Sequence, residues 1–261
     1  MASRDPHRGK TEIVIFGRHP VLDALGSPHV EVSLVRFAKG TPPQDRKALQ
    51  AAGRAEDVPL EEVTRDELSR WTHAARHDQG VAARVRLLEV TEVEAFLAAA
   101  TGRNARKPLR LLALDGVTNS QNVGMVVRSV VGAGLEGLVW PTVGQPWVNG
   151  LVVRAAVGAV FACPILRCET LVGGLAALQA AGFEVYGLDA GGNAGLFDVE
   201  PAHRSVFVLG SEARGLSEEV AGQLDRRLSI PMAGPLESLN VAVAAGLVAY
   251  HAAGLTRGAR R

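Results

Sequence analysis

The feature that most constrains the fold is an alternation of short apolar runs with helical patterns along the chain. It is clearest in the second half, where an apolar run at 109–114 precedes a helical pattern at about 122–132, and a run at 137–140 precedes another at about 151–160. Strands that are apolar on both faces and alternate with helices form mostly parallel sheets covered by helices. The sequence therefore predicts an α/β fold. The later expected elements are a helix at 171–181, strands at 183–188, 206–209 and 227–230, a short helix after Ser217 and a helix from about Ser238 to Ala253.

The first hundred residues show the same rhythm. Thr64-x-x-Glu67 and Thr91-x-x-Glu94 both fit the capping box, in which a hydroxyl and a carboxylate satisfy free N–H groups at a helix start. We therefore expect one helix to begin at each, with a strand between them at 81–88. The earlier expected elements are strands at 13–16 and 32–38 and helices at 21–25 and 47–55.

Residues 101–108 divide these two halves. The segment has glycine, proline and several charged or amide side chains, and Ala105 is its only apolar residue, which is typical of a linker. We expect a small N-terminal α/β domain over 1–100, whose residues 1–10 form a basic tail, and a second α/β domain over 109–261.

Composition favours a globular protein. Of the 261 residues, 47% are hydrophobic and 21% charged, the apolar stretches are too short to span a bilayer, and the first ten residues do not resemble a secretory signal. We therefore expect no membrane partner and a cytoplasmic location. The net charge of +1 does not by itself indicate a polyanionic partner, although basic clusters at both ends and around 103–110 are suited either to phosphate contact or to solvated tails.

Several weaker patterns favour structural roles. Cys163 and Cys168 are too few for a disulfide framework, so we expect packing residues. His73 and His77 share helical spacing but lack a third ligand, and we expect no metal. The glycines at 132–137 close a helix instead of opening one, which favours a helix stop over nucleotide binding.

Three polar loops of the second half are better candidates for a site. Each follows a predicted strand, and ligands of open α/β sheets bind at the carboxyl ends of strands. Turns and helix caps would explain much of the same composition, with Asn119, Ser120 and Ser238 as possible caps. An uncharged amide at Asn240, inside an otherwise apolar helix start, is not explained that way. The loops span Asp115–Ser129, Val208–Ser217 and Ile230–Val241.

Taken together, these loops resemble the three signature motifs of the SpoU/TrmH family of RNA ribose 2′-O-methyltransferases, part of the SPOUT class. Arg154–Ala159 is similar to a further family stretch, so the resemblance covers about 109–255. The matching residues are Asn122-Val-Gly124 with Arg128, Leu209-Gly210-Ser-Glu212-x-x-Gly215-Leu216, and Ile230-Pro-Met232-x-Gly234 followed by Glu237-Ser238-Leu239-Asn240-Val241.

The resemblance implies a C-terminal trefoil knot, a homodimer that supplies the reacting arginine across its interface, and S-adenosylmethionine as cofactor. The implied cofactor contacts are Leu209, Gly210, Ile230, Met232, Ser238 and Leu239. The implied catalytic residues are Arg128, Asn122, Glu212, Ser238 and Asn240. The family's arginine has been proposed as a general base, but a guanidinium normally stays protonated, so we favour Arg128 as a phosphate or ribose clamp.

The front half resembles, more loosely, the RNA-binding domain of the RlmB-like branch, which methylates a guanosine ribose in large-subunit ribosomal RNA. The similar stretches are Gly17–Leu25 and Gln79–Val85, with Asp78 inserted after His77. The resemblance implies 23S ribosomal RNA as substrate. A transfer RNA methyltransferase, an antibiotic-resistance ribosomal RNA methyltransferase and an inactive RNA-binding or ribosome-assembly protein remain alternatives.

Overall fold

A computed structural model describes residues 11–100 and 107–256. The expected linker at 101–108 and both basic ends therefore lie largely outside the described residues. The described chain packs as two compact units, one built from 11–89 with 148–162, the other from 90–147 with 163–256. Among the described residues, no helix has the length and apolarity needed to cross a membrane.

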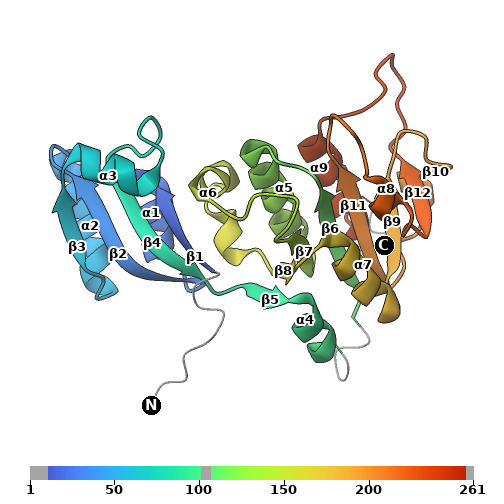
Figure 1. The fold of residues 1–261 in the computed structure, drawn as a ribbon, viewed down its shortest axis with the longest axis horizontal. Coiled ribbons are helices and arrows are strands. Elements are labelled where there is room, and N and C mark those ends of the chain that lie inside the picture. Colours follow the sequence, from blue (N-terminus) through green and yellow to red (C-terminus); the bar gives the residue numbers. More distant parts are fainter. Residues whose placement is uncertain (1–10, 101–106, 257–261) are drawn as a thin grey trace. The chain divides into compact units, whose positions relative to one another are not determined.

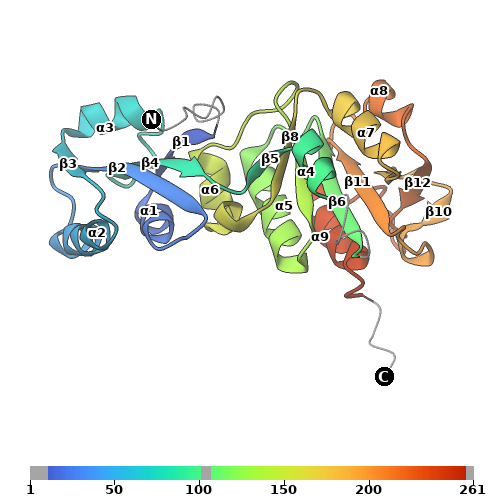
Figure 2. The ribbon, with the colours of Figure 1, turned by 90° about the horizontal axis from the view of Figure 1, so that it is seen from below.

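The first unit is a four-stranded mixed sheet in the order β1-β4-β2-β3, with antiparallel pairs β1–β4 and β4–β2 and a parallel pair β2–β3. Figure 2 shows α1 and α2 on one face of this sheet and α3 on the other. The elements are β1 (Glu12–Phe16), α1 (Arg18–Leu25), β2 (Val30–Ala38), α2 (Pro43–Ala55), β3 (Leu60–Val63), α3 (Arg65–Thr72), β4 (Val81–Leu87) and α6 (Gly150–Ala156), followed by a 3-10 turn at Ala159–Ala162.

The second unit is an eight-stranded sheet in the order β10-β12-β9-β11-β6-β7-β8-β5, and every pair is parallel. Its strands and helices are labelled in Figure 1, and Figure 2 shows α5 and α9 on one face with α4, α7 and α8 on the other. The strands are β5 (Val90–Glu92), β6 (Leu109–Asp115), β7 (Gly137–Pro141), β8 (Ile165–Cys168), β9 (Glu184–Leu188), β10 (Ala194–Gly195), β11 (Arg204–Gly210) and β12 (Arg226–Ser229). The helices are α4 (Val93–Ala99), α5 (Ser120–Ala133), α7 (Leu171–Ala180), α8 (Glu218–Ala221) and α9 (Val241–Ala252), with a 3-10 turn at Leu196–Asp198.

The α/β class with a mostly parallel second sheet is therefore confirmed. The core strands β6 and β11 are almost entirely buried, as their uninterrupted apolar sequences predicted. Cys163 and Cys168 are buried free thiols whose pKa burial raises to about 12, which agrees with packing residues. Gly134 closes α5 in the left-handed conformation, as the helix-stop interpretation required.

Several local expectations are wrong. Thr64 forms the full capping box with Glu67, but Thr91 pairs with Leu166 inside β5, so α4 starts at Val93 without a side-chain cap. The helix expected at 151–160 ends at Ala156, because Val157 and Gly158 both adopt positive φ. The short strands β3, β5, β8 and β10 were not predicted, since two to four residues carry little periodicity.

Candidate active site

The site lies where neighbouring parallel strands end. Strands β12, β9, β11 and β6 are adjacent and run in the same direction, so the loops that follow them leave the sheet at one edge. Three of these loops are those the sequence singled out, after β6, β11 and β12. The fourth follows β9 and carries Asp189.

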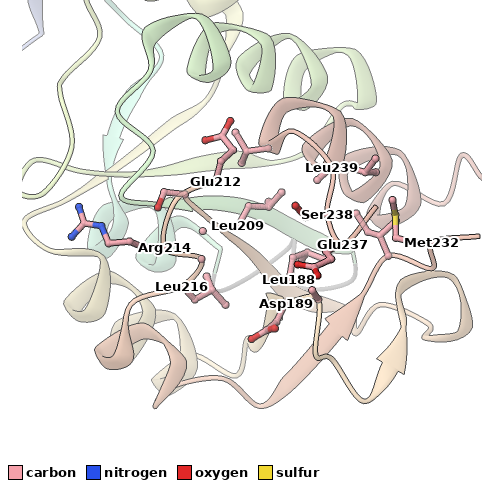
Figure 3. A pocket seen from close by; sticks show the side chains of 17 residues that line it. Leu188, Asp189, Leu209, Glu212, Arg214, Leu216, Met232, Glu237, Ser238 and Leu239 are labelled. Carbon is pink, nitrogen blue, oxygen red and sulfur yellow. The ribbon is translucent and has the colours of Figure 1, made fainter. Parts of the chain in front are cut away.

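The loops after β9, β11 and β12 enclose a cavity of about 340 Å³. Its walls come from the end of β9, the loop after β11, and the segment between β12 and α9, as Figure 3 shows. The volume falls within the range of roughly 300–1,000 Å³ that is usual for small-molecule sites. All six residues expected to contact a cofactor line it, namely Leu209, Gly210, Ile230, Met232, Ser238 and Leu239.

The wall after β11 is a tight backbone turn. The Ser211 and Gly215 amides each donate to the other residue's carbonyl, at 3.1 and 2.8 Å. A Cβ on Gly210 would collide with the backbone of Gly215, and Gly215 itself has a φ of +66°. The turn is also anchored beyond its end, where the Ser217 amide donates to Asp115 of β6 at 2.6 Å. Close backbone approach therefore requires a glycine at 210, and the positive φ favours a glycine at 215.

The opposite wall is the loop 230–239. The sequence placed a helix start and its cap at Ser238, and that expectation is wrong. Helix α9 starts at Val241, and its cap is Asn240, whose Oδ1 accepts from the Ala242 amide at 3.0 Å. Ser238 and Leu239 consequently remain in the loop, where they line the cavity. Asn240 is thus a cap and not a polar residue inside the helix.

Three predicted residues meet beside the cavity in one hydrogen-bonded cluster. The Asn122 amide donates to Glu212 Oε1, and the Asn240 amide donates to the same oxygen at 3.1 Å. Asn240 Nδ2 also lies 3.3 Å from Asn122 Oδ1. Glu212 therefore accepts from both amides and joins the loop after β11 to two helices.

Helix packing explains why these residues meet. Helices α5 and α9 lie side by side on the same face of the sheet (Figure 2), and Asn122 and Asn240 belong to the first turn of α5 and the N-cap of α9. The Glu212 carboxylate is therefore next to the N-terminal ends of both helices, where free N–H groups and the helix dipole favour negative charge.

Arg128 is not brought into the cavity. It lies on an exposed stripe of α5 with Gln121, Met125 and Gly132, at helical spacing, and it makes no hydrogen bond or ion pair with any other described residue. Its guanidinium is free to contact another molecule.

Three charged residues of the cavity wall were not among the expected site residues. Asp189, Arg214 and Glu237 all line it, and Figure 3 shows the Arg214 side chain directed away from the other labelled residues. The Asp189 signal was available in principle, because it directly follows a predicted buried strand. Glu237 and Arg214 lie inside the motifs, but nothing in the sequence indicated that either side chain would line the cavity. Within the described parts of the chain, no three His, Cys, Asp or Glu side chains cluster as a metal site would require.

Comparison with known proteins identifies the family. The model described as the SpoU rRNA Methylase family matches residues 110–250, more than half of the chain. The chain belongs to the SpoU rRNA methylase family. A second model, described as RNA 2′-O ribose methyltransferase substrate binding, matches residues 14–91. The resemblance to the SpoU/TrmH family is thereby confirmed.

Relatives and solved structures agree with this assignment. The chain is 36% identical over 251 residues to an uncharacterized tRNA/rRNA methyltransferase of Mycobacterium ulcerans, covering 94% of this chain and 78% of that one. It shares the fold of the SpoU methyltransferase AviRb from Streptomyces viridochromogenes in complex with the cofactor AdoMet, with 23% identity, a TM-score of 0.74 and coverage of 99% and 96%. A protein solved in a study of 2-OH methylation of C/U34 on tRNA is 32% identical, with a TM-score of 0.51, over 58% of this chain and 99% of that one.

The cluster around Glu212 predicts unequal costs for two cap deletions. Asn240→Ala removes both the cap of α9 and a donor to Glu212, whereas Thr170→Ala removes only the cap of α7. We expect Thr170→Ala to lower the free energy of unfolding by about 0.5–2 kcal/mol, and Asn240→Ala to lower it further. Urea denaturation followed by circular dichroism measures both. Equal losses would show that the contact with Glu212 contributes nothing to stability.

Proposed function

We propose that this protein transfers a methyl group from S-adenosylmethionine to the 2′-hydroxyl of a ribose in RNA, with a guanosine of 23S ribosomal RNA as the target. The observation that carries the proposal is one cavity lined by Gly210 from the end of β11 and by Ile230 and Leu239 from the loop 230–239. Membership of the SpoU family and the match of residues 14–91 to a 2′-O ribose methyltransferase substrate-binding model support the reaction and the RNA substrate.

The cavity has the chemistry that this cofactor requires. S-adenosylmethionine supplies an electrophilic methyl group on a cationic sulfonium. Apolar side chains of Leu188, Leu209 and Ile230 suit the adenine ring, and the carboxylates of Asp189 and Glu237 favour a cation. Gly210 lines the cavity, so its backbone can contact the cofactor. The related fold of AviRb, solved with AdoMet, supports this assignment.

In this proposal, the chain's own residues position and polarise the reacting groups. The Asn122–Glu212–Asn240 cluster fixes the cavity loops against α5 and α9, and Ser238 offers a hydroxyl to the ribose or phosphate of the substrate. Arg128 binds a phosphate or ribose oxygen as a protonated fork and stabilises negative charge that develops on the attacking oxygen. The 2′-hydroxyl proton is released to solvent as the methyl–sulfur bond breaks, because a protonated guanidinium cannot accept it. Correct positioning alone lowers such barriers by several kcal/mol, up to about 7–11.

We further propose that two copies form the active protein. Met125 of α5 and Val243 and Tyr250 of α9 are 39–49% exposed, which leaves an apolar surface beside Arg128. A second copy that covers this surface would bring its own Arg128 towards the first copy's cavity. The trefoil knot, the cytoplasmic location, a role in ribosomal RNA processing and the functional division into domains over 1–100 and 109–261 stay predictions.

Transfer RNA is the second candidate substrate. The 32% identity to the protein studied for methylation of C/U34 on tRNA favours it, but that match covers only 58% of this chain. Mapping of ribose methylation in total RNA, from cells with and without this protein, separates the two. We expect one additional 2′-O-methylated guanosine in 23S RNA. A new mark in transfer RNA would replace the substrate assignment, and a new base methylation or none would contradict the reaction.

Gly210→Ala is predicted to abolish cofactor binding, because its Cβ would collide with the Gly215 backbone and displace the cavity wall. Gly234→Ala is the matched control, since nothing lies within 4 Å of a Cβ there. Isothermal titration with S-adenosylmethionine should show binding to the wild type and Gly234→Ala only. Retained wild-type affinity in Gly210→Ala would contradict the cavity assignment.

Arg128→Lys tests the clamp. The substitution keeps the charge but loses the planar fork, so we expect methyl transfer to fall by at least about 10²-fold, as in deletions of a transition-state donor. Affinity for S-adenosylmethionine should be unchanged, because Arg128 does not line the cavity. Transfer of tritiated methyl to RNA and calorimetry provide the two readouts. Wild-type turnover by Arg128→Lys would remove Arg128 from the reaction.

A further inference from the structure

Three side chains of the first unit, Arg76, His77 and Arg154, carry hydrogen-bond donors, and none of them lines the cavity. We propose that Arg76, His77 and Arg154 form a binding site for RNA phosphate groups. The inference rests on the proposed function in that RNA is the substrate. It adds the residues that bind the RNA backbone. One of them, Arg154, lies in the segment 148–162, which the SpoU methylase model matches and the substrate-binding model does not.

The loop that carries Arg76 and His77 is rigidly built. Its centre is Asp78, a fully buried carboxylate that accepts from the Gly80 amide at 2.9 Å and from the Thr72 hydroxyl at 3.3 Å. Arg65 forms an ion pair with the same carboxylate at 2.9 Å and donates to the Ala75 carbonyl at 3.2 Å. This network neutralises the acid inside the loop and fixes the backbone around it.

The contact between Arg154 and His77 determines what this surface offers. Arg154 Nη1 lies 3.1 Å from His77 Nδ1, and both side chains are exposed. A guanidinium can only donate, so Nδ1 is the acceptor and the neutral ring carries its proton on Nε2. The pair therefore presents the Nε2–H of His77 and the remaining N–H groups of Arg154. Phosphate oxygens, which only accept, are complementary to such a surface.

Charge pairing distinguishes these residues from several arginines of the same unit. Arg36, Arg46 and Arg86 each form an ion pair with a glutamate on the sheet. By contrast, no ion pair within the described residues joins Arg76 or Arg154 to a carboxylate, although both are exposed. Their charge is therefore not neutralised within the unit. In the proposed reaction, the phosphate groups of the RNA substrate would supply the negative charge that pairs with these arginines.

The test is the salt dependence of RNA binding. Each phosphate contact contributes about 0.7–0.9 to the slope of log K against log salt concentration. We expect Arg154→Gln and Arg76→Gln each to reduce this slope by about that amount and to weaken binding of a fluorescein-labelled RNA hairpin several-fold at low salt, measured by anisotropy. Arg154→Lys, which keeps the charge, should retain most of the slope. Arg54→Gln is the control, because Arg54 is an exposed arginine in the last turn of α2.

The readout separates this site from the proposed reaction. Calorimetry with S-adenosylmethionine should give wild-type affinity for both glutamine variants, which also shows that they are folded. A wild-type slope and affinity for RNA in Arg154→Gln and Arg76→Gln would overturn the site, even if the protein methylates RNA. Reduced slopes in a protein that transfers no methyl group would support the site and reject the proposed reaction.

Discussion

The arrangement of the second unit depends on one carboxylate that accepts hydrogen bonds from two amides. Glu212 lies in the loop after β11, while Asn122 and Asn240 belong to α5 and α9. These three residues are far apart in the sequence, and their contact holds three chain segments together at one edge of the sheet. The N-terminal ends of both helices favour the negative charge. The cavity next to this cluster is consequently formed by loops whose positions are fixed from two sides.

One wall of the cavity is a turn in which two backbone segments lie too close together for a side chain to fit between them. The turn from Ser211 to Gly215 closes on itself through reciprocal amide–carbonyl bonds, and Gly210 leaves no room for a Cβ. In our proposal, this wall binds the cofactor through its backbone, and side-chain chemistry is concentrated in the loop 230–239 and on α5. The fold thus separates a rigid cofactor site from Arg128, which stays exposed and available to substrate.

Much of this arrangement was predictable because it depends on local signals. Buried parallel strands give continuous apolar runs, and glycine-rich polar loops after them indicated the cavity walls at Gly210 and Ile230. What failed depended on tertiary contacts. Ser238 and Asn240 are both good caps by composition, and only the contact with Glu212 and the path of the loop favour Asn240. Thr91 matched a capping box, yet pairing of β5 with β8 placed it in a strand. Likewise, no sequence pattern indicates that 148–162 packs with the first unit, so the Arg154–His77 contact required the structure.

A crystal structure with S-adenosylmethionine bound tests the central claim most directly. The account predicts the donor inside the cavity, in contact with Gly210, Ile230 and Leu239, with its methyl group facing the side on which Asn122 and Glu212 lie. Density for the donor at any other place on the chain, or a cavity that stays closed to it at saturating concentration, would contradict the account.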